Sequence, residues 1–413
     1  MKQHITSLLI HGNKEEKSVE SNRSLKIPIY ETASFDFETS EDMEKAFRGE
    51  SNAFSYSRIS NPTVNELQDR LQLFSGSAHS LCVSSGMAAI SNIFLTLCSA
   101  GDNIITSRYL FGNTYSLFAN TLSSFKIETR FTDLNNLTEI ASHIDSNTRA
   151  IFLEVPTNPQ LIIFDIEKIA ALAQEKQIPL VVDNSILTPY AFHAKEFGVD
   201  IEIFSNTKFI SGGATSIGGA IEIYQSNKWQ FVPKLKKEYD AFGQQAFYKR
   251  LYKEIYRNIG ACLSPSSAWL QLLGLETIGV RIDRIEENAL AVAQFLENHQ
   301  KVKQVTYLSL PSYKYFDRAK KYTNGHGGCL INLTLTDKKA CYKMMDKLKM
   351  VRRGTNFCDN KSMIIHPAST IYWDYSATDK KLMLINEGTL RLSVGLEHRD
   401  DIIQDLAQAL QSI

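Results

Sequence analysis

The chain has 413 residues, of which 43 % are hydrophobic and 22 % charged, and its 45 basic and 45 acidic side chains give a formal net charge of zero. This length predicts two or three lobes with a sizeable core, and the composition excludes a disordered chain. The even charge balance argues against nucleic acid or a membrane surface as a partner.

The six cysteines are scattered without a CxxC pair, which argues against a disulfide framework or a zinc site and fits a reducing compartment. Residues 1–17 lack the apolar core of a signal peptide. No uninterrupted apolar run reaches the ~18 residues of a membrane span. We therefore expect a cytoplasmic protein without a metal site.

Residues 1–57 are mixed and polar, and we expect them to form an arm that contacts a neighbouring subunit. From residue 62 to residue 224 short apolar strands alternate with helical patterns, which predicts an α/β fold with a mostly parallel sheet in a large domain, residues 58–270. We expect strands at 81–83, 103–106, 128–131, 150–154, 179–183, 201–204 and 219–224, and helices at 62–74, 88–97, 114–122 and 166–176.

The remaining chain predicts a smaller α+β C-terminal domain, residues 271–413. Residues 226–260 are polar, aromatic and helical in pattern, and the sequence leaves their role open. We expect helices at 277–298, 339–348 and 400–410, and strands at 305–308, 329–335, 362–366 and 389–394.

Lys208 follows Ser205 and Thr207 directly after an expected strand. An amine in this place can form a Schiff base with an aldehyde cofactor, while the two hydroxyls hold the phosphate of that cofactor. A surface lysine in a polar loop is the usual alternative for any single lysine. The first interpretation is favoured because other parts of the chain supply what a pyridoxal phosphate site needs.

Three of these parts also follow expected strands, where open α/β sheets bind their ligands. The turn Ser85-Gly86-Met87 opens a helix whose N-terminal N–H groups can bind a phosphate, although such turns are common in packing. Asp183 ends an apolar strand, where its carboxylate suits a protonated pyridine nitrogen, or equally a helix cap or a buried ion pair. Asn158 can donate to a ring hydroxyl, or can be a turn residue.

Two arginines can bind anions. Arg58 presents a planar fork suited to a phosphate, and Tyr56 beside it adds an O–H donor. Arg391 extends from a late strand and suits the carboxylate of an amino acid, although a salt bridge to a nearby glutamate is the usual alternative.

Six motifs occur together along the chain: Tyr56-Ser57-Arg58 with Asn61-Pro62-Thr63, Ser85-Gly86-Met87-Ala88-Ala89, Val182-Asp183-Asn184, Ser205-Asn206-Thr207-Lys208, His366-Pro367-Ala368-Ser369 and Arg391-Leu392-Ser393-Val394-Gly395. With them the chain resembles, over nearly its whole length, the Cys/Met-metabolism family of pyridoxal-phosphate enzymes. That family includes cystathionine synthases and lyases, methionine γ-lyase and O-acylhomoserine sulfhydrylases. Two further runs, 213–219 and 257–265, are most similar to O-acetylhomoserine sulfhydrylases.

The resemblance implies a fold type I transferase and a role for each residue. Lys208 carries pyridoxal 5′-phosphate and shuttles protons, Asp183 meets the pyridine nitrogen, and Arg391 binds the substrate carboxylate. The phosphate is bound by the Gly86 and Met87 backbone with Ser205 and Thr207, and by Tyr56 and Arg58 of a neighbouring subunit. At least a homodimer is therefore implied, and usually a homotetramer.

The departures from the family concern the substrate end. Phe111 stands where the family has a tyrosine, so it can stack on the cofactor but cannot donate a proton to a leaving group. Asn356, a substrate-binding position in relatives, lies in the altered run 356–359, where Cys358 is an active-site thiol or a small packing residue. Ile371 and Tyr372 replace the usual Thr-His.

We therefore expect γ-replacement on an O-acylhomoserine-type amino acid with sulfide or a thiol. A cystathionine γ-synthase, a methionine or cystathionine γ-lyase, or a tailoring enzyme for an unusual four-carbon amino acid remain alternatives, and a non-catalytic cofactor-binding scaffold is a remote one. The sequence leaves open the acyl donor, the nucleophile, elimination against replacement, and dimer against tetramer.

Overall fold

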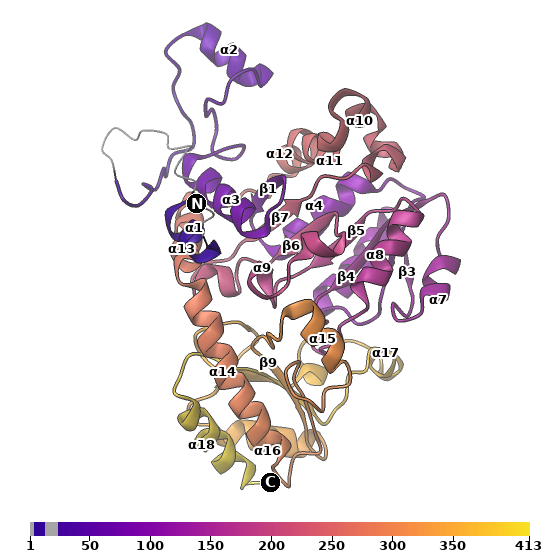
Figure 1. The fold of residues 1–413 in the computed structure, drawn as a ribbon, viewed down its shortest axis with the longest axis vertical. Coiled ribbons are helices and arrows are strands. Elements are labelled where there is room, and N and C mark those ends of the chain that lie inside the picture. The colour runs from indigo at the N-terminus through magenta and orange to yellow at the C-terminus, as the bar shows by residue number, and fades with distance from the viewer. Residues whose placement is uncertain (1–3, 13–23) are drawn as a thin grey trace.

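Two β-sheets with helices packed on them organise the computed structural model, which describes residues 4–12 and 24–413 (Figure 1). Parts of the segment 1–17 and of the expected arm therefore lie outside the described residues. The larger sheet has the strand order β1-β7-β6-β5-β4-β2-β3. Its strands are β1 (His79–Val83), β2 (Asn103–Thr106), β3 (Glu128–Phe131), β4 (Thr148–Glu154), β5 (Leu180–Asp183), β6 (Ile201–Phe204) and β7 (Gly219–Ile223).

The larger sheet is mostly parallel, as predicted. Strands β6, β5, β4, β2 and β3 run parallel, whereas β7 is antiparallel to both of its neighbours, β1 and β6. The central strands are buried along their length because helices cover both faces. The parallel strands therefore end at one edge, where β4, β5 and β6 bring Glu154, Asp183 and the Ser205–Lys208 turn together.

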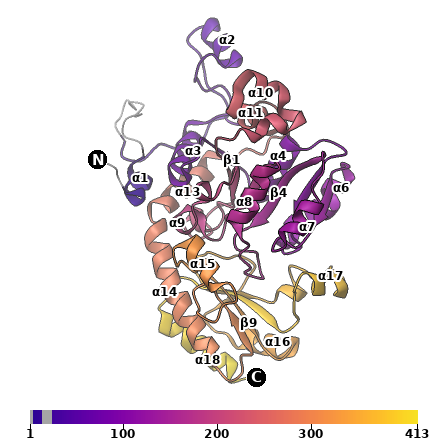
Figure 2. The ribbon, with the colours of Figure 1, turned by 45° about the vertical axis from the view of Figure 1, so that its right-hand side comes forward.

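Helices pack on both faces of the larger sheet (Figures 1 and 2). One face carries α3 (Pro62–Ser75), α7 (Leu137–Ser142), α8 (Ile166–Glu175), α9 (Thr188–Ala191) and α13 (Pro265–Glu276). The other carries α4 (Gly86–Leu97), α5 (Gly112–Ser116), α6 (Leu122–Ser124), α10 (Lys236–Phe242) and α11 (Ala246–Arg250). The short helix α12 (Arg257–Ile259) follows on this side and has no buried residue. The expected helix 114–122 lies within a continuous helical stretch formed by α5, a π-helical segment, Leu117–Thr121, and α6.

The C-terminal part builds a second, five-stranded sheet in the order β10-β11-β12-β9-β8. Its strands are β8 (Gln304–Thr306), β9 (Leu330–Thr334), β10 (Arg352–Arg353), β11 (Met363–Ile365) and β12 (Thr389–Ser393). The helices of this part are α14 (Ile278–Glu297), α15 (Phe316–Thr323), α16 (Lys338–Lys347), α17 (Ala377–Leu382) and α18 (Arg399–Leu410). The expected domain boundary at 270/271 falls within α13, six residues before that helix ends at Glu276, and stays a prediction.

The N-terminal segment holds two helices that the polar pattern did not predict, α1 (Ile5–His11) and α2 (Ser40–Arg48). Helix α1 packs on α3 and α13 of its own chain, with Leu9 buried and its carbonyl accepting a 2.6 Å bond from Arg70. Helix α2 has no buried residue and projects away from the body (Figures 1 and 2). The described residues 24–57 are mostly exposed, so α2 and the chain on either side of it are available to another chain.

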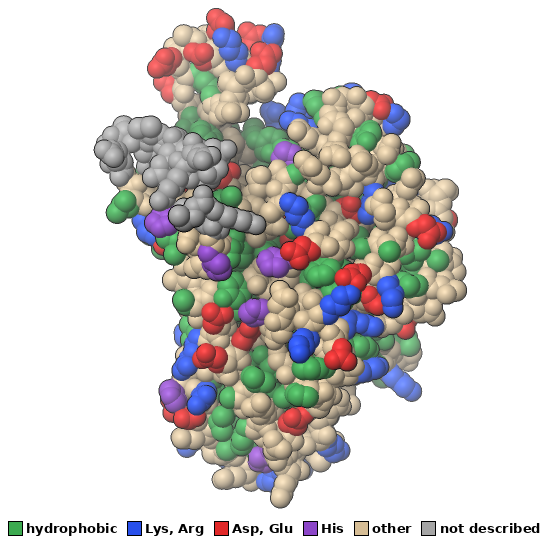
Figure 3. Space-filling model, viewed as in Figure 1, with side chains coloured by type: hydrophobic (Ala, Val, Ile, Leu, Met, Phe, Trp, Pro, Cys, Tyr) green, Lys and Arg blue, Asp and Glu red, His purple; other side chains and the backbone are tan. Residues whose placement is uncertain are grey.

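The surface agrees with the balanced composition. Acidic and basic side chains are interspersed over the face drawn in Figure 3. Across the described part of the chain, no helix is both long and apolar enough to cross a bilayer. The same residues contain no cluster of three or more His, Cys, Asp or Glu side chains suited to a metal ion.

Candidate active site

A cavity of about 210 Å³ opens at the carboxyl ends of β4, β5 and β6. Most of the residues predicted to bind the cofactor line it: Ser85, Gly86, Met87, Phe111, Asn158, Asp183, Ser205, Thr207 and Lys208. The lining also includes residues that the sequence did not single out: Ile90, Thr114, Glu154, Pro156, Ser185, Ile186 and Phe357. The topology therefore brings the dispersed motifs to one place.

One end of the cavity suits a phosphate. Ser85 caps helix α4 by accepting a 3.0 Å bond from the N–H of Ala88, and the first N–H groups of the helix have no partner within it. A Cβ at Gly86 would lie 2.9 Å from the Cβ of Ser205, so only glycine allows this turn to approach the end of β6 so closely. The hydroxyl of Thr207 accepts a 3.2 Å bond from the N–H of Gly218. Backbone and hydroxyl donors thus surround a space that an anion fits.

Asp183 lines the cavity, and its carboxylate forms no ion pair with a basic side chain of the described residues. Its Oδ1 accepts bonds from the N–H of Ser185 at 3.0 Å and from the Ser185 hydroxyl at 2.6 Å. The Ser185 oxygen in turn accepts the N–H of Ser205 at 2.7 Å. No Lys, Arg or His among the described residues lies within 4.0 Å of the Asp183 carboxylate, and burial raises its pKa. Such a carboxylate suits a cationic N–H supplied by a ligand.

Lys208 carries an amine that is prepared for nucleophilic attack. Its Nζ donates to the Asn356 side-chain oxygen at 2.7 Å and lies 4.4 Å from the centre of the Phe357 ring. Burial lowers the pKa of Lys208, which raises the fraction of neutral amine. Asn356 does not line the cavity, but it orients the lysine that does.

Arg391 is the second unusual cation of the site. It is 1 % exposed, and its guanidinium donates to the Asn158 side-chain oxygen at 3.0 Å and to the Thr355 carbonyl at 2.9 Å. Its Nε has no partner, and no carboxylate of the described residues forms an ion pair with it. Burial lowers the pKa of Arg391 to about 10. A buried guanidinium without an anion is suited to receive the carboxylate of a ligand.

Glu154 is a site residue that sequence reasoning missed. It pairs in register with Asp183 across β4 and β5, lines the cavity, and is 5 % exposed. Burial, together with the Asp183 charge, raises its pKa well above the usual range. The signal was available, because Glu154 ends an apolar strand just as Asp183 does.

Phe111 and Cys358, two positions that depart from the family pattern, differ in whether they line the cavity. Phe111 lines the cavity, as its expected stacking role requires. Cys358 is buried, and its Sγ lies 3.0 Å from the Sγ of Cys329 and outside the cavity lining. This position favours the packing interpretation of Cys358 over an active-site thiol.

Tyr56 and Arg58 are the two predicted phosphate ligands that do not reach the cavity of their own chain. Tyr56 is 42 % exposed, and the Arg58 guanidinium stacks 5.5 Å from its ring and donates to the carbonyl of Arg257. Both side chains lie at the surface, where another chain can approach them.

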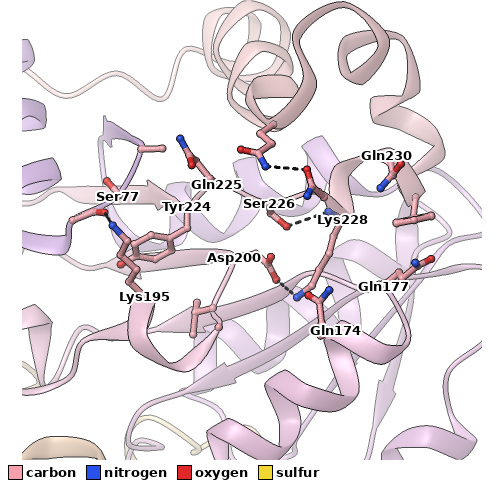
Figure 4. A pocket seen from close by; sticks show the side chains of 17 residues that line it. Ser77, Gln174, Gln177, Lys195, Asp200, Tyr224, Gln225, Ser226, Lys228 and Gln230 are labelled. Atoms are coloured by element: carbon pink, nitrogen blue, oxygen red, sulfur yellow. Dashed lines mark hydrogen bonds and ion pairs between the residues drawn. The ribbon is translucent and has the colours of Figure 1, made fainter.

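A second, larger cavity of about 670 Å³ is lined mostly by amide and hydroxyl side chains (Figure 4). Its one deeply buried amine, Lys228, is already paired with Asp200 at 2.7 Å. None of the predicted site residues lines it. The first cavity is therefore the candidate for chemistry. Its phosphate-sized donor end, the unpaired Asp183 carboxylate and the Lys208 amine fit pyridoxal phosphate.

Comparison with known proteins supports the same cofactor. The family model described as Cys/Met metabolism PLP-dependent enzyme matches residues 6–411. The sulfhydrylase FUB7 of Fusarium oxysporum f. sp. lycopersici is 38 % identical to the chain, covering 94 % of the chain and 93 % of that protein. The homocysteine/cysteine synthase of Saccharomyces cerevisiae is 33 % identical, covering 100 % and 99 %.

A solved structure gives the same result. A crystal structure from Campylobacter jejuni, described as an O-acetylhomoserine (thiol)-lyase, superposes with a TM-score of 0.94 and 34 % identity, covering 99 % of this chain and 100 % of that one. It contains a pyridoxyl-lysine monophosphate group. The matches confirm the predicted fold class and the predicted cofactor.

Proposed function

Because the chain belongs to the family of Cys/Met metabolism enzymes that depend on pyridoxal 5′-phosphate, we propose that it catalyses γ-replacement on an O-acylhomoserine-type amino acid, with sulfide or a thiol as the nucleophile. The observation that carries this proposal is the pair of cations in contact with one ring. Phe357 lies 4.4 Å from the Lys208 amine and 5.2 Å from the Arg391 guanidinium. The proposed base, Lys208, and the proposed carboxylate receptor, Arg391, thus both contact the ring of Phe357.

Each residue of the site has a separate role in the proposed reaction. Bound pyridoxal phosphate supplies an electron sink for the pair of electrons left when the α-proton departs. Arg391 binds the donor carboxylate, and the Lys208 amine removes the α-proton and returns it. Loss of a β-proton, which returns to Cβ after the nucleophile has added, lets the Cγ–O bond break with its electrons leaving on the acyl carboxylate. The nucleophile then adds at Cγ, so O-acetylhomoserine and sulfide yield homocysteine and acetate.

Phe111 favours an acyl donor over a thioether donor. A carboxylate leaves without needing a proton, whereas a departing thiolate gains from an acid, and Phe111 has no hydroxyl to supply one. Phe111→Tyr is expected to raise turnover of cystathionine or methionine relative to O-acetylhomoserine, measured as the ratio of kcat/KM values. An unchanged ratio would show that Phe111 does not determine which donor the enzyme prefers.

Incubation with O-acetylhomoserine, with and without sulfide, tests the reaction directly. We expect homocysteine to form only with sulfide, as measured by mass spectrometry, with Lys208→Ala as the blank. If 2-oxobutyrate dominates in both samples, the enzyme is a γ-lyase. If cysteine as the nucleophile gives cystathionine faster than sulfide gives homocysteine, it is a cystathionine γ-synthase.

Two further alternatives are separated by the same samples. If the cofactor absorbs in the visible and no product forms, the site selects an unusual four-carbon amino acid. If the visible absorbance persists in Lys208→Ala without any turnover by the unaltered protein, the chain is a cofactor-binding scaffold. The Lys208 amine, whose pKa is lowered by burial, and the buried Arg391 disfavour this last alternative, since a scaffold needs neither.

The proposal extends to assembly: the active unit is a homodimer or homotetramer in the cytoplasm, in which the Tyr56 and Arg58 side chains complete the cavity of a neighbouring subunit. It is supported by the distance of both residues from the cavity of their own chain and by the projecting α2. A phosphate with only the α4 and β6 donors around it lacks the cationic partner that Arg58 would provide.

Mixing two inactive variants tests this arrangement. Arg58→Ala and Lys208→Ala are each expected to be inactive or nearly so, and subunit exchange between them is expected to restore about a quarter of the unaltered activity. Half of the random dimers are hybrids, and each hybrid has one site with both residues intact. If the two residues act in the same chain, no hybrid regains activity, and the trans arrangement is wrong.

A further inference from the structure

The turns at Phe111 and at Asn158 meet at the active site, and two side chains, Glu154 and Tyr372, each hydrogen-bond to both turns. On one side, the Glu154 carboxylate accepts the N–H of Phe111 at 2.8 Å with Oε1 and the N–H of Asn158 at 3.1 Å with Oε2. One buried carboxylate thereby joins the turn that carries the Phe111 ring to the turn that carries Asn158.

On the other side lies Tyr372, which comes from the C-terminal part of the chain and is fully buried. Its hydroxyl lies 2.8 Å from the carbonyl oxygen of Leu110 and 3.2 Å from that of Asn158. The Leu110–Phe111 peptide therefore bonds to Tyr372 through its C=O and to Glu154 through its N–H. Asn158 is held in the same way, through its own C=O and N–H.

Asn158 is also the link to the carboxylate receptor, because its side-chain oxygen accepts the 3.0 Å bond from Arg391. We propose that Tyr372 and Glu154, which we name the clamp, are positioning residues that set the orientation of Arg391 relative to the Phe111 face, so that the carboxylate of the amino-acid donor is bound in register with the cofactor. This inference rests on the proposed function only in assigning the donor carboxylate to Arg391.

The geometry gives the clamp this role rather than a merely packing one. Phenylalanine would fill the space of the ring equally well, but only the hydroxyl can donate to these carbonyl groups, which share its single proton. Tyr375 provides the contrast three residues later: its hydroxyl bonds the carbonyl of Gly112 at 2.8 Å, on the same turn, without reaching Asn158 or Arg391. Tyr375 thus supports the turn and leaves the carboxylate receptor alone.

The experiment compares Tyr372→Phe with the matched control Tyr375→Phe in the holoenzyme. The probes are glycine, which has a carboxylate, and methylamine, which is glycine without one, and binding is followed through the visible absorbance of the cofactor. For Tyr372→Phe we expect the glycine dissociation constant to rise about five- to tenfold and that of methylamine to change less than about twofold. For Tyr375→Phe we expect both probes within about twofold.

A double-mutant cycle between Tyr372→Phe and Arg391→Lys shows whether Tyr372 acts through Arg391. We expect the combined effect on glycine binding to be smaller than the product of the single effects, whereas Tyr375→Phe and Arg391→Lys combine multiplicatively. Equal weakening of glycine and methylamine, or a multiplicative Tyr372 cycle, would overturn the proposal. So would an effect of Tyr375→Phe as large as that of Tyr372→Phe.

Two features keep the test decisive. If Tyr372→Phe does not fold, Glu154→Gln replaces it, since an amide retains only one acceptor oxygen for the N–H groups of Phe111 and Asn158; the same selective loss of glycine binding is expected. Neither probe has a γ-substituent, so no turnover is needed. The binding experiment can therefore be interpreted even if O-acetylhomoserine is not a substrate. Conversely, a negative binding result would disprove the role of Tyr372 and Glu154 without disproving the proposed reaction.

Discussion

Replacing Lys208 by alanine is expected to lower kcat by at least about 10³-fold, because this removes both the covalent anchor of the cofactor and the base that moves the α-proton. The cavity offers no substitute. Of its other lining residues, Asp183 and Glu154 are the ionisable ones, and burial raises the pKa of each. The measurement is steady-state turnover of O-acetylhomoserine with sulfide, together with the visible spectrum of the purified protein.

A surface lysine gives the matched control. Lys195 is exposed, bonds the carbonyl of Gly76 at 2.9 Å and does not line the candidate site, so Lys195→Ala is expected to keep kcat within about twofold. A small primary amine added to Lys208→Ala is expected to recover part of the rate, since it can act as a base in the vacated space. Turnover within tenfold of the unaltered enzyme would assign the proton transfer to another group.

The fold was predictable wherever apolar runs alternate with helical periods. The expected strands 103–106, 128–131 and 201–204 match β2, β3 and β6 at both ends. The buried parallel strands β2 and β6 give a clear signal because their residues are mostly apolar on both faces, whereas β3 is a partly exposed edge strand. The helices α1 and α2 were missed for the opposite reason, since they are short and α2 is fully solvated.

The site was predictable as far as its chemistry depends on residue type and strand ends. Lys208, Asp183 and Gly86 line one cavity, as expected of residues that follow neighbouring strands. Glu154 obeys the same rule and was overlooked. Tyr372 and Phe357 were not predictable from the residues alone, because their positions depend on how the C-terminal part packs against the larger sheet. That packing is a long-range property that no local pattern encodes.

Arg391 combines both kinds of information, since its residue type indicates a carboxylate and only the structure shows that no carboxylate of the described protein satisfies it. Arg391→Leu is expected to lower kcat/KM for the amino-acid donor by about 10²- to 10³-fold, because the desolvated ion pair with the donor is lost in the ground state and in the transition state. Steady-state kinetics over a range of donor concentrations measure this loss.

The same variant is expected to fold nearly as stably as the unaltered chain. Burial lowers the pKa of Arg391 to about 10, so at neutral pH the charged side chain is less favourable in the folded state than in the unfolded state, and removing it relieves that cost. The Asn158 side-chain oxygen and the Thr355 carbonyl lose their donors, which acts in the opposite direction. We therefore expect the free energy of unfolding to change by less than about 2 kcal/mol.

Thermal unfolding with glycine present separates the two effects. Glycine is expected to raise the Tm of the unaltered holoenzyme and to raise that of Arg391→Leu much less, since a ligand stabilises a protein in proportion to how tightly the folded state binds it. Arg391→Lys, which keeps the charge but not the planar fork, is expected to fall between them. A strongly destabilised Arg391→Leu whose donor KM is unchanged would show that this arginine supports the fold and that the donor carboxylate binds elsewhere.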